Sequence, residues 1–275
     1  MNIGIIGLGL MGGSLAKSIK ARTHNNVFAT DIDSETMLFA RLSGAIDAEL
    51  SDENISACNL IFLAVSPKAA IEWVKKNAEK IDKNTVVIDL CGVKRAVSDE
   101  ILPIALENGF LYIGGHPMAG IERSGFVNST PDLFVGASMI LSPEEHVDIR
   151  VLEMLKALFI DVGFANVTFT TADEHDRIIA FTSQLAHVVS SAYVKSPEAQ
   201  KQRGFSAGSF KDMTRLDEHL WTQLFLDNTD YIAQQLETLI NNLNEYLDAI
   251  KENDAQTLEA LLKDGREKKA LAGGN

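Results

Sequence analysis

The chain has 275 residues, of which 46% are hydrophobic, and this is enough to bury the core of one large domain or two moderate ones. Its formal net charge of −13 disfavours binding to nucleic acid or to an anionic membrane surface. No apolar run approaches the roughly 18 residues of a membrane-spanning helix, and the first apolar segment, which begins at residue 3, is ended by a glycine-rich loop, so we expect neither a membrane anchor nor a signal peptide.

A short β-branched run at the start of the chain leads directly into a glycine-rich turn. Ile3 to Ile6 predict a strand, and Gly7, Gly9 and Gly12 follow it at GxGxxG spacing, before a helical pattern. Gly7 would allow the tight turn, Gly9 the close approach of phosphates, and Gly12 close packing of the helix on the strand. The backbone N–H groups at the start of the helix would then bind a pyrophosphate.

An acidic residue stands at the distance that dinucleotide sites require. Asp31 follows Gly12 by 19 residues, at the end of a second apolar segment, Val27 to Thr30. Roughly 20 residues are expected before the carboxylate that binds the adenosine ribose. The next residues, IDSET, contain no Arg or Lys to receive a 2′-phosphate, so we expect NAD rather than NADP. The alternative is a plain strand-to-helix turn in which Asp31 only caps a helix.

The chain continues with the same alternation of strands and helices. A helix is predicted over Ser34 to Ser43, a buried strand over Leu60 to Val65, and a helix over Lys68 to Lys80. Ser66 at the N-cap and Pro67 at the first helical position favour this helix start. The backbone around Ala64 to Pro67 should line the cofactor crevice, because ligands bind at the carboxyl ends of the strands.

The pattern then repeats up to about residue 165. Strands are predicted over Thr85 to Leu90, Phe110 to Gly114 and Ala137 to Leu141, with helices that end near Asn108 and Val162. Residues 1–165 are therefore predicted to form an α/β domain of the doubly wound Rossmann type, with a mostly parallel sheet.

Residues 166–275 are predicted to form an all-helical domain. Glu174 to Lys195 reads as one long helix, and Asp254 to Leu271 as the last one. Between them, an apolar stripe recurs at steps of three and four residues, at Leu236, Leu239, Ile240, Leu243, Tyr246, Leu247 and Ile250. This region has long helices but too little sheet or loop structure to form a free-standing domain. We therefore expect it to pack against a second copy of itself, as the dimerisation domain of a homodimer. A monomeric helical cap is the alternative.

A few residues outside the glycine loop could take part in chemistry. Cys58 and Cys91 are the two cysteines, without metal spacing, so we expect no metal site, two reduced thiols and a cytoplasmic location. His116 in GGHPMAG would follow a strand beside the crevice, where a neutral imidazole suits a base for hydroxyl oxidation. The pair His175-Asp176, the string SQLAH ending at His187, and KDMTR from Lys211 to Arg215 also stand out.

With these motifs, the sequence resembles the prephenate and arogenate dehydrogenases of tyrosine biosynthesis along almost the whole chain. The resemblance rests on GLGLMGGSLA, DLCGVK, GGHPMAG, HDRIIAFTSQLAH and FKDMTR, with Trp221 shortly after. It implies NAD-dependent oxidative decarboxylation of prephenate, or of arogenate, a cyclohexadienyl substrate. His116 would accept the proton from the ring hydroxyl, and Arg215 would bind the ring carboxylate through a bidentate fork.

The resemblance also implies the remaining site residues. His187, Lys211 and Trp221 would lie near the pyruvyl side chain, from the same subunit or from its partner, while Glu122 and Gly92 would lie beside the substrate. The predicted cofactor-binding residues are Gly7, Gly9, Leu10, Met11, Gly12, Asp31, Val65, Ser66 and Pro67. Structural alternatives stay open: a turn histidine at 116, a core histidine at 187, a core tryptophan at 221 and a surface arginine at 215.

Two positions depart from the family pattern. Many members have serine where this chain has Gly92, and the serine hydroxyl can bridge the catalytic histidine and the substrate hydroxyl. Ile121 stands where some members have threonine. These differences leave open which group orients His116. Another hydroxyacid or imine-processing dehydrogenase, or a non-catalytic NAD-sensing protein, remains the rival interpretation. We also expect no fused mutase or regulatory domain.

Overall fold

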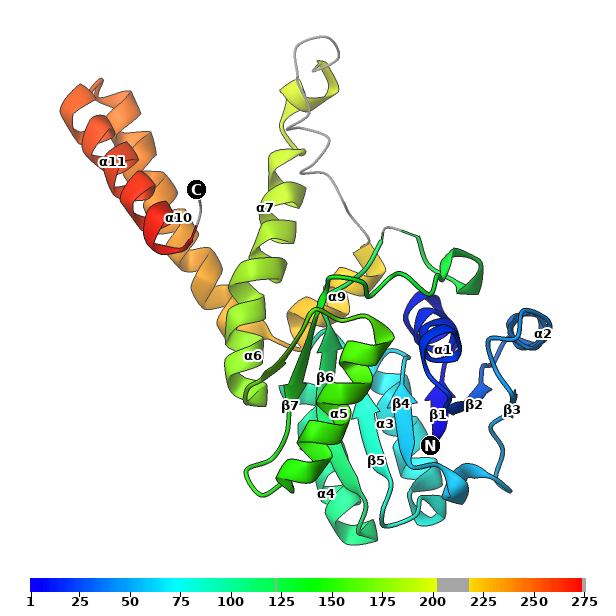
Figure 1. Ribbon diagram of the computed structural model, residues 1–275. Coiled ribbons are helices and arrows are strands. Elements are labelled where there is room, and N and C mark those ends of the chain that lie inside the picture. Colours follow the sequence, from blue (N-terminus) through cyan, green and yellow to red (C-terminus); the bar gives the residue numbers. More distant parts are fainter. Residues whose placement is uncertain (122, 202–217, 274–275) are drawn as a thin grey trace.

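An eight-stranded sheet forms the centre of the N-terminal part of the protein (Figure 1). The computed structural model describes residues 1–121, 123–201 and 218–273. The strands are β1 (Asn2–Ile6), β2 (Asn26–Thr30), β3 (Ala48–Glu49), β4 (Leu60–Leu63), β5 (Val86–Asp89), β6 (Leu111–Pro117), β7 (Ser138–Ser142) and β8 (Asn166–Phe169). Their spatial order is β3-β2-β1-β4-β5-β6-β7-β8. The first six strands are parallel, and the reversal of order between β1 and β4 marks the place where such sheets bind dinucleotides.

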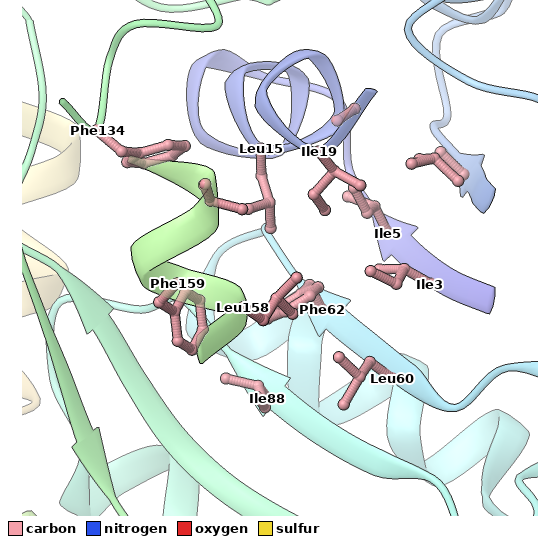
Figure 2. Close-up of a cluster of buried hydrophobic side chains, with 14 of the residues drawn as sticks. Ile3, Ile5, Leu15, Ile19, Leu60, Phe62, Ile88, Phe134, Leu158 and Phe159 are labelled. Carbon is pink, nitrogen blue, oxygen red and sulfur yellow. The ribbon is translucent and has the colours of Figure 1, made fainter. Parts of the chain in front are cut away.

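Helices cover both faces of the sheet, which confirms the doubly wound arrangement. The helices of this part are α1 (Leu10–Arg22), α2 (Ser34–Leu42), α3 (Pro67–Asn77), α4 (Arg95–Asn108) and α5 (Ile149–Val162). Helices α1 and α5 pack against each other over one face, and α3 and α4 over the other. Figure 2 shows side chains of the first core, where Leu15 and Ile19 of α1 meet Phe62 of β4 and Phe159 of α5.

The edge of the sheet beyond β6 differs from the predicted pattern. Strand β7 runs antiparallel to β6, and β8, which the sequence analysis did not predict, runs parallel to β7. Strand β8 has a weakly apolar sequence, NVTF, and is mostly exposed, so it lacks the continuous apolar signal of the central strands. Because β8 belongs to the sheet, the sheet reaches Phe169. The division of the chain at residues 165 and 166 stays a prediction.

The prediction that the strand before His116 ends at Gly114 is wrong. Strand β6 continues to Pro117, and His116 lies inside it. The first half of β6 pairs with β5, whereas Gly114 to Pro117 pair with β7, His116 opposite Ile140. The antiparallel neighbour therefore extends the strand through two glycines and a proline that the sequence pattern marked as a turn.

The described part of the chain after β8 is helical. Its helices are α6 (Ala172–Ile179), α7 (Ala186–Tyr193), α9 (Glu218–Leu226), α10 (Thr229–Lys251) and α11 (Ala255–Leu271). The predicted long helix exists as α6 and α7 joined by a π-helical stretch, Ala180–Leu185. Helices α10 and α11 pair with each other and project away from the sheet (Figure 1). No helix among the described residues is long and apolar enough to span a membrane.

Candidate active site

The glycine loop has the geometry of a phosphate cradle. Gly7 has φ of +87°, and a Cβ there would lie 2.5 Å from Val65 Cγ1. A Cβ on Gly12 would lie 1.9 Å from the carbonyl oxygen of Gly7, so only glycine allows α1 to start this close to β1. A Cβ on Gly9 would meet no atom within 4 Å. Gly7 and Gly12 are therefore required by the fold, whereas Gly9 leaves space that a ligand can use.

The first turn of α1 supplies hydrogen-bond donors beside this space. Helix α1 begins at Leu10, and the first backbone bond of its ladder runs from Gly13 N to Gly9 O. The N–H groups of Leu10, Met11 and Gly12 therefore have no acceptor within the helix. Together with the positive end of the helix dipole, they form a site for an anion such as a pyrophosphate.

The Asp31 carboxylate holds the glycine loop in place. One oxygen accepts a hydrogen bond from Leu8 N at 2.6 Å, and the other accepts one from Asp33 N at 2.9 Å. The next helix, α2, is capped by Asp33, whose side chain accepts from Glu35 N and Thr36 N. Asp33 and not Asp31 therefore caps α2, and the Asp31 carboxylate is tied to the glycine loop.

A cleft of about 640 Å³ opens between the glycine loop and the end of β4. Five of the predicted cofactor residues are among its lining residues: Gly7, Gly9, Asp31, Val65 and Ser66. Pro67 is the first residue of α3, as predicted, and Ser66 is the N-cap residue, although its side chain makes no capping hydrogen bond. The size and lining suit the adenosine half of a dinucleotide.

His116 connects the sheet to the helical region. Its Nδ1 atom lies 2.9 Å from Nε2 of His175, which is in α6. Nδ1 of His175 in turn lies 2.7 Å from Oδ1 of Asp176. His116 is half-buried, while His175 and Asp176 are 2% and 0% exposed. Burial and the proximity of His175 and Lys94 lower the pKa of His116 well below its ordinary value, so the imidazole is neutral at pH 7.

A buried charged cluster supports the strand on which His116 lies. The Lys94 ammonium, 1% exposed, donates to the Asp89 carboxylate and, at 2.6 Å, to the carbonyl oxygen of Gly115. The hydroxyl of Tyr112 donates to the other Asp89 oxygen at 2.7 Å. The sequence analysis did not single out these three residues as functional. The available signal was the motif DLCGVK, which begins at the last residue of a buried strand, Asp89, and ends in Lys94.

Helix α9 approaches the site from the C-terminal region. A Cβ on Gly92 would lie 3.2 Å from Cδ2 of Leu224, so this helix faces the loop between β5 and α4. Trp221, one turn earlier on α9, stacks on His187 of α7, with ring centroids 3.4 Å apart. His187 Nδ1 lies 2.9 Å from the carbonyl oxygen of Ser183, which leaves Nε2 for another partner. The structure thus brings together two of the predicted substrate residues.

Buried amides hold α6, α9 and α10 together. The Asn228 side chain is fully buried and donates to Gln184 Oε1 and to the carbonyl oxygen of Asp176. Gln184, in the π-helical stretch, donates to the carbonyl oxygen of Leu224. Arg95 donates to Asn228 and Asp230, and these hydrogen bonds connect the start of α4 to the helical region. Asn228 was missed at the sequence level because its partners are distant in the chain.

Three predicted substrate residues, Glu122, Lys211 and Arg215, lie outside the described residues. Their assigned positions stay predictions. The described residues therefore provide the cofactor cleft, the histidine and the aromatic stack, whereas the predicted carboxylate anchor is known from the sequence alone.

Comparison with known proteins gives matches along nearly the whole chain. Two family models match: the prephenate dehydrogenase nucleotide-binding domain over residues 15–168, and the prephenate dehydrogenase dimerization domain over residues 171–264. A prephenate dehydrogenase of Lactococcus lactis is 30% identical over 276 residues, which cover 95% of this chain and 75% of that protein. A cyclohexadienyl dehydrogenase of Zymomonas mobilis is 27% identical, over 94% of this chain and 91% of that protein.

A solved structure agrees with these matches. The crystal structure of a prephenate dehydrogenase from A. aeolicus, in complex with hydroxyphenyl propionate and NAD+, superposes with a TM-score of 0.86. Its sequence is 27% identical, and the superposition covers 99% of this chain and 98% of that one. Both parts of the fold therefore have the same arrangement as in that enzyme.

Proposed function

The chain belongs to the prephenate dehydrogenase family and is an NAD-dependent oxidoreductase, and on that premise we propose that His116 is its catalytic base in the oxidative decarboxylation of prephenate to 4-hydroxyphenylpyruvate. The observation that carries the proposal is the position of His116. It is a neutral, half-buried imidazole on β6, held through Nδ1 by His175, so that Nε2 is left for the substrate.

The cofactor cleft fits NAD. The open space at Gly9 and the free N–H groups at the start of α1 suit the pyrophosphate, and Asp31 lines the part of the cleft suited to the adenosine ribose. The Asp31 carboxylate would repel a 2′-phosphate, which supports NAD over NADP. When bound, NAD+ supplies the acceptor for the hydride that leaves the substrate ring.

The residues of this chain then have to orient and deprotonate the substrate. Nε2 of His116 takes the proton of the ring hydroxyl, and the C–H electron pair leaves the ring carbon as hydride. The ring carboxylate leaves as CO₂, the electron pair of the broken C–C bond completes the aromatic ring, and His116 returns its proton to the phenolate oxygen. Arg215 binds that carboxylate, with Glu122 and Gly92 beside the substrate. His187, Trp221 and Lys211 contact the pyruvyl side chain. Because the product ring is aromatic, the reaction needs positioning and one base rather than strong activation.

The proposal is tested by measuring NADH formation with prephenate, with arogenate and with simple 2-hydroxy acids. We expect NADH and 4-hydroxyphenylpyruvate in equal amounts from prephenate. NADH from 2-hydroxy acids alone would favour another hydroxyacid dehydrogenase, and NAD binding without turnover of any of these would favour an NAD-sensing protein. Either result would overturn the proposal.

Arogenate is the second candidate substrate. The similarity to the cyclohexadienyl dehydrogenase of Zymomonas mobilis, a name that covers this substrate class, favours testing it. The two substrates differ at the side chain that His187 and Trp221 would contact, where one has a keto group and the other an ammonium group. The ratio of kcat/KM for the two substrates, measured side by side, decides between them.

We also propose that the enzyme is a cytoplasmic homodimer formed by its helical domain. The family model that matches residues 171–264 is that of a dimerization domain. On α10 the side chains of Ile240, Leu243, Leu247 and Ile250 are 46–58% exposed, which is a long apolar stripe. Cys58 and Cys91 are free buried thiols, in keeping with a reducing compartment.

The double substitution of Leu243 and Leu247 by Glu tests the dimer. We expect a shift from dimer to monomer in sedimentation velocity, because charges cannot be buried in an apolar interface. Val127→Glu, which changes a side chain that is 80% exposed on the cofactor domain, is the matched control and should remain dimeric. A wild-type monomer would contradict the proposal.

A further inference from the structure

His175 and Asp176 make a chain of polar contacts that ends at His116. The three side chains come from β6 and α6, and the distances are 2.9 Å from His116 Nδ1 to His175 Nε2 and 2.7 Å from His175 Nδ1 to Asp176 Oδ1. His175 and Asp176 are 2% and 0% exposed, so neither side chain is open to a substrate that enters from solvent. The reaction proposed above uses His175 only as the contact of His116 Nδ1 and gives Asp176 no role.

The first step in assigning the protons is the charge of Asp176. Its Oδ1 also accepts a hydrogen bond from Lys94 N at 2.8 Å, and its Oδ2 accepts one from Arg95 N at 2.9 Å. Burial alone would raise the pKa of Asp176, but the hydrogen bonds from His175 and these two N–H groups lower it below its ordinary value. The carboxylate is therefore ionised and can only accept, so Nδ1 of His175 carries a hydrogen.

The second step is the state of His175. Burial lowers the pKa of this imidazole more than its bond to Asp176 raises it, so the ring is neutral. A neutral imidazole with hydrogen on Nδ1 has a lone pair on Nε2. His116 must then donate from its own Nδ1, which leaves the lone pair of His116 on Nε2. Among the described residues, His116 Nε2 has no hydrogen-bond partner.

We propose that His175 and Asp176 are positioning residues that hold His116 in the tautomer with hydrogen on Nδ1, and so make Nε2 the proton acceptor. The inference rests on the proposed role of His116 as the base. When the substrate O–H bond breaks, its proton forms a new N–H bond at Nε2, and the Nδ1 hydrogen stays in its bond to His175. The positive charge on His116 is then stabilised by the Asp176 carboxylate across the neutral ring of His175.

This arrangement answers the question raised by Gly92. Glycine has no hydroxyl that could orient His116, and a side chain at residue 92 would point toward Leu224. The His175–Asp176 pair instead orients the base from the opposite nitrogen. Since α6 opens the helical region, the docking of that region on the sheet sets the tautomer of the catalytic histidine.

Charged groups surround the pair on several sides. The ammonium of Lys94, the residue just before α4, opposes a positive charge on His116, and Arg95, the first residue of α4, lies 3.5 Å from Asp176 Oδ2. From β5, Asp89 compensates Lys94. Asp173 of α6 and Asp230 of α10 pair with Arg95. Asp176 is the carboxylate in contact with the His175 ring, so its negative charge is the one that acts on His175 directly and on His116 through His175.

The tautomer is measured directly by NMR of protein labelled with ¹⁵N-histidine. The chain has six histidines, and the His116→Asn variant identifies the signals of His116. In the wild type we expect a protonated Nδ1 and an unprotonated Nε2. In His175→Leu, which removes the acceptor, we expect a mixture of both tautomers. In His175→Gln, whose amide oxygen can accept from Nδ1, we expect the wild-type tautomer. Hydrogen on Nε2 in the wild type, or no change in His175→Leu, would overturn the inference.

Kinetics with prephenate give a second readout. We expect kcat to fall about 100-fold in His175→Leu and by less than about tenfold in His175→Gln, with KM for prephenate and NAD within about threefold of the wild type. Thermal unfolding shows whether each variant is folded. If His175→Leu is not folded, Asp176→Asn takes its place, and we expect this variant also to lose about 100-fold in kcat. Equal losses in Leu and Gln variants would indicate a structural role only and overturn the inference. The NMR result does not depend on turnover, so it also distinguishes failure of this inference from failure of the proposed function.

Discussion

The cofactor cleft and the reaction site are built in different ways. The cleft is made mainly from backbone, by the turn from Gly7 to Gly9 between β1 and α1, and by the ends of β2 and β4, the two strands beside β1. The reaction site is made from side chains on β6, α6, α7 and α9, and the contact between His116 and His175 joins residues 59 positions apart. A substitution in the cleft should therefore act on binding and folding, and one in the reaction site on turnover.

The largest expected effect lies in the reaction site. His116→Asn removes the base and should reduce kcat with prephenate by about two or more orders of magnitude, while the Kd for NAD stays the same. Stopped-flow or steady-state NADH formation measures kcat, and fluorescence titration measures NAD binding. His146→Asn, which changes an exposed histidine on a loop, is the control and should behave as the wild type. Unchanged turnover in His116→Asn would exclude this histidine as the base.

In the cleft, two glycines separate folding from cofactor binding. Gly12→Ala places a Cβ 1.9 Å from Gly7 O, and we expect it to reduce the free energy of unfolding by on the order of 3 kcal/mol. Gly9→Ala meets no protein atom within 4 Å, so it should cost less than about 1 kcal/mol of stability. It should nevertheless weaken NAD binding about tenfold, because the methyl group enters the phosphate space. Chemical denaturation and NAD titration measure the two effects.

The result for this pair of variants bears on the role of Gly9. If Gly9→Ala binds NAD as tightly as the wild type, the pyrophosphate does not pass over this residue. If Gly12→Ala is as stable as the wild type, the close approach of α1 to the turn at Gly7 is not required. Either outcome would break the distinction between a backbone-built cleft and a side-chain-built site.

The pH dependence is the next effect in size. Burial lowers the pKa of His116 below the ordinary value of about 6.5, so the base stays neutral as the pH falls through that value. We expect kcat/KM to remain level down to about pH 6 and to fall tenfold per pH unit only below the lowered pKa. Below about pH 6.5 the unfolded chain binds protons at residues 116 and 175 that the folded chain does not, so the free energy of unfolding should fall there.

An acid limb at the ordinary histidine pKa would mean that His116 is more solvated during the reaction than in this structure. Thermal melts of the His175→Gln variant provide the matched comparison for stability. Because this variant has one buried histidine fewer, its melting temperature should decrease less than that of the wild type between pH 7 and pH 5.

The difference between the two sites also explains what could be predicted from the sequence. Gly7, Gly9, Gly12 and Asp31 stand close together in the sequence, and their spacing alone predicted the cleft. The partner of His116 could not be predicted in this way, because nothing in the local pattern indicates that α6 docks beside β6. His175-Asp176 stood out as a pair, but its contact with His116 depends on the packing of two domains.

The same limit applies to the sheet edge and to α9. His116 was placed after a strand because Gly114, Gly115 and Pro117 are typical of turns, yet pairing with β7 extends β6 through them. Local preference was overridden by a neighbour that lies more than twenty residues later in the chain. Leu224 likewise meets Gly92 only through tertiary packing. Backbone conformation that a few adjacent residues determine is predictable, and contacts between distant elements are not.

The smallest expected effect concerns Gly92, where many family members have serine. In Gly92→Ser the new Cβ lies 3.2 Å from Leu224 Cδ2, so this leucine has to move slightly, and we expect a loss of about 1 kcal/mol in the free energy of unfolding. In a Leu224→Ala background the same substitution should cost less, which a double-mutant cycle measures. Since His175 already orients His116 through Nδ1, the added hydroxyl should change kcat by less than about threefold. A rise in kcat above about tenfold would show instead that His116 is poorly oriented in this chain and that the serine supplies what His175 and Asp176 do not.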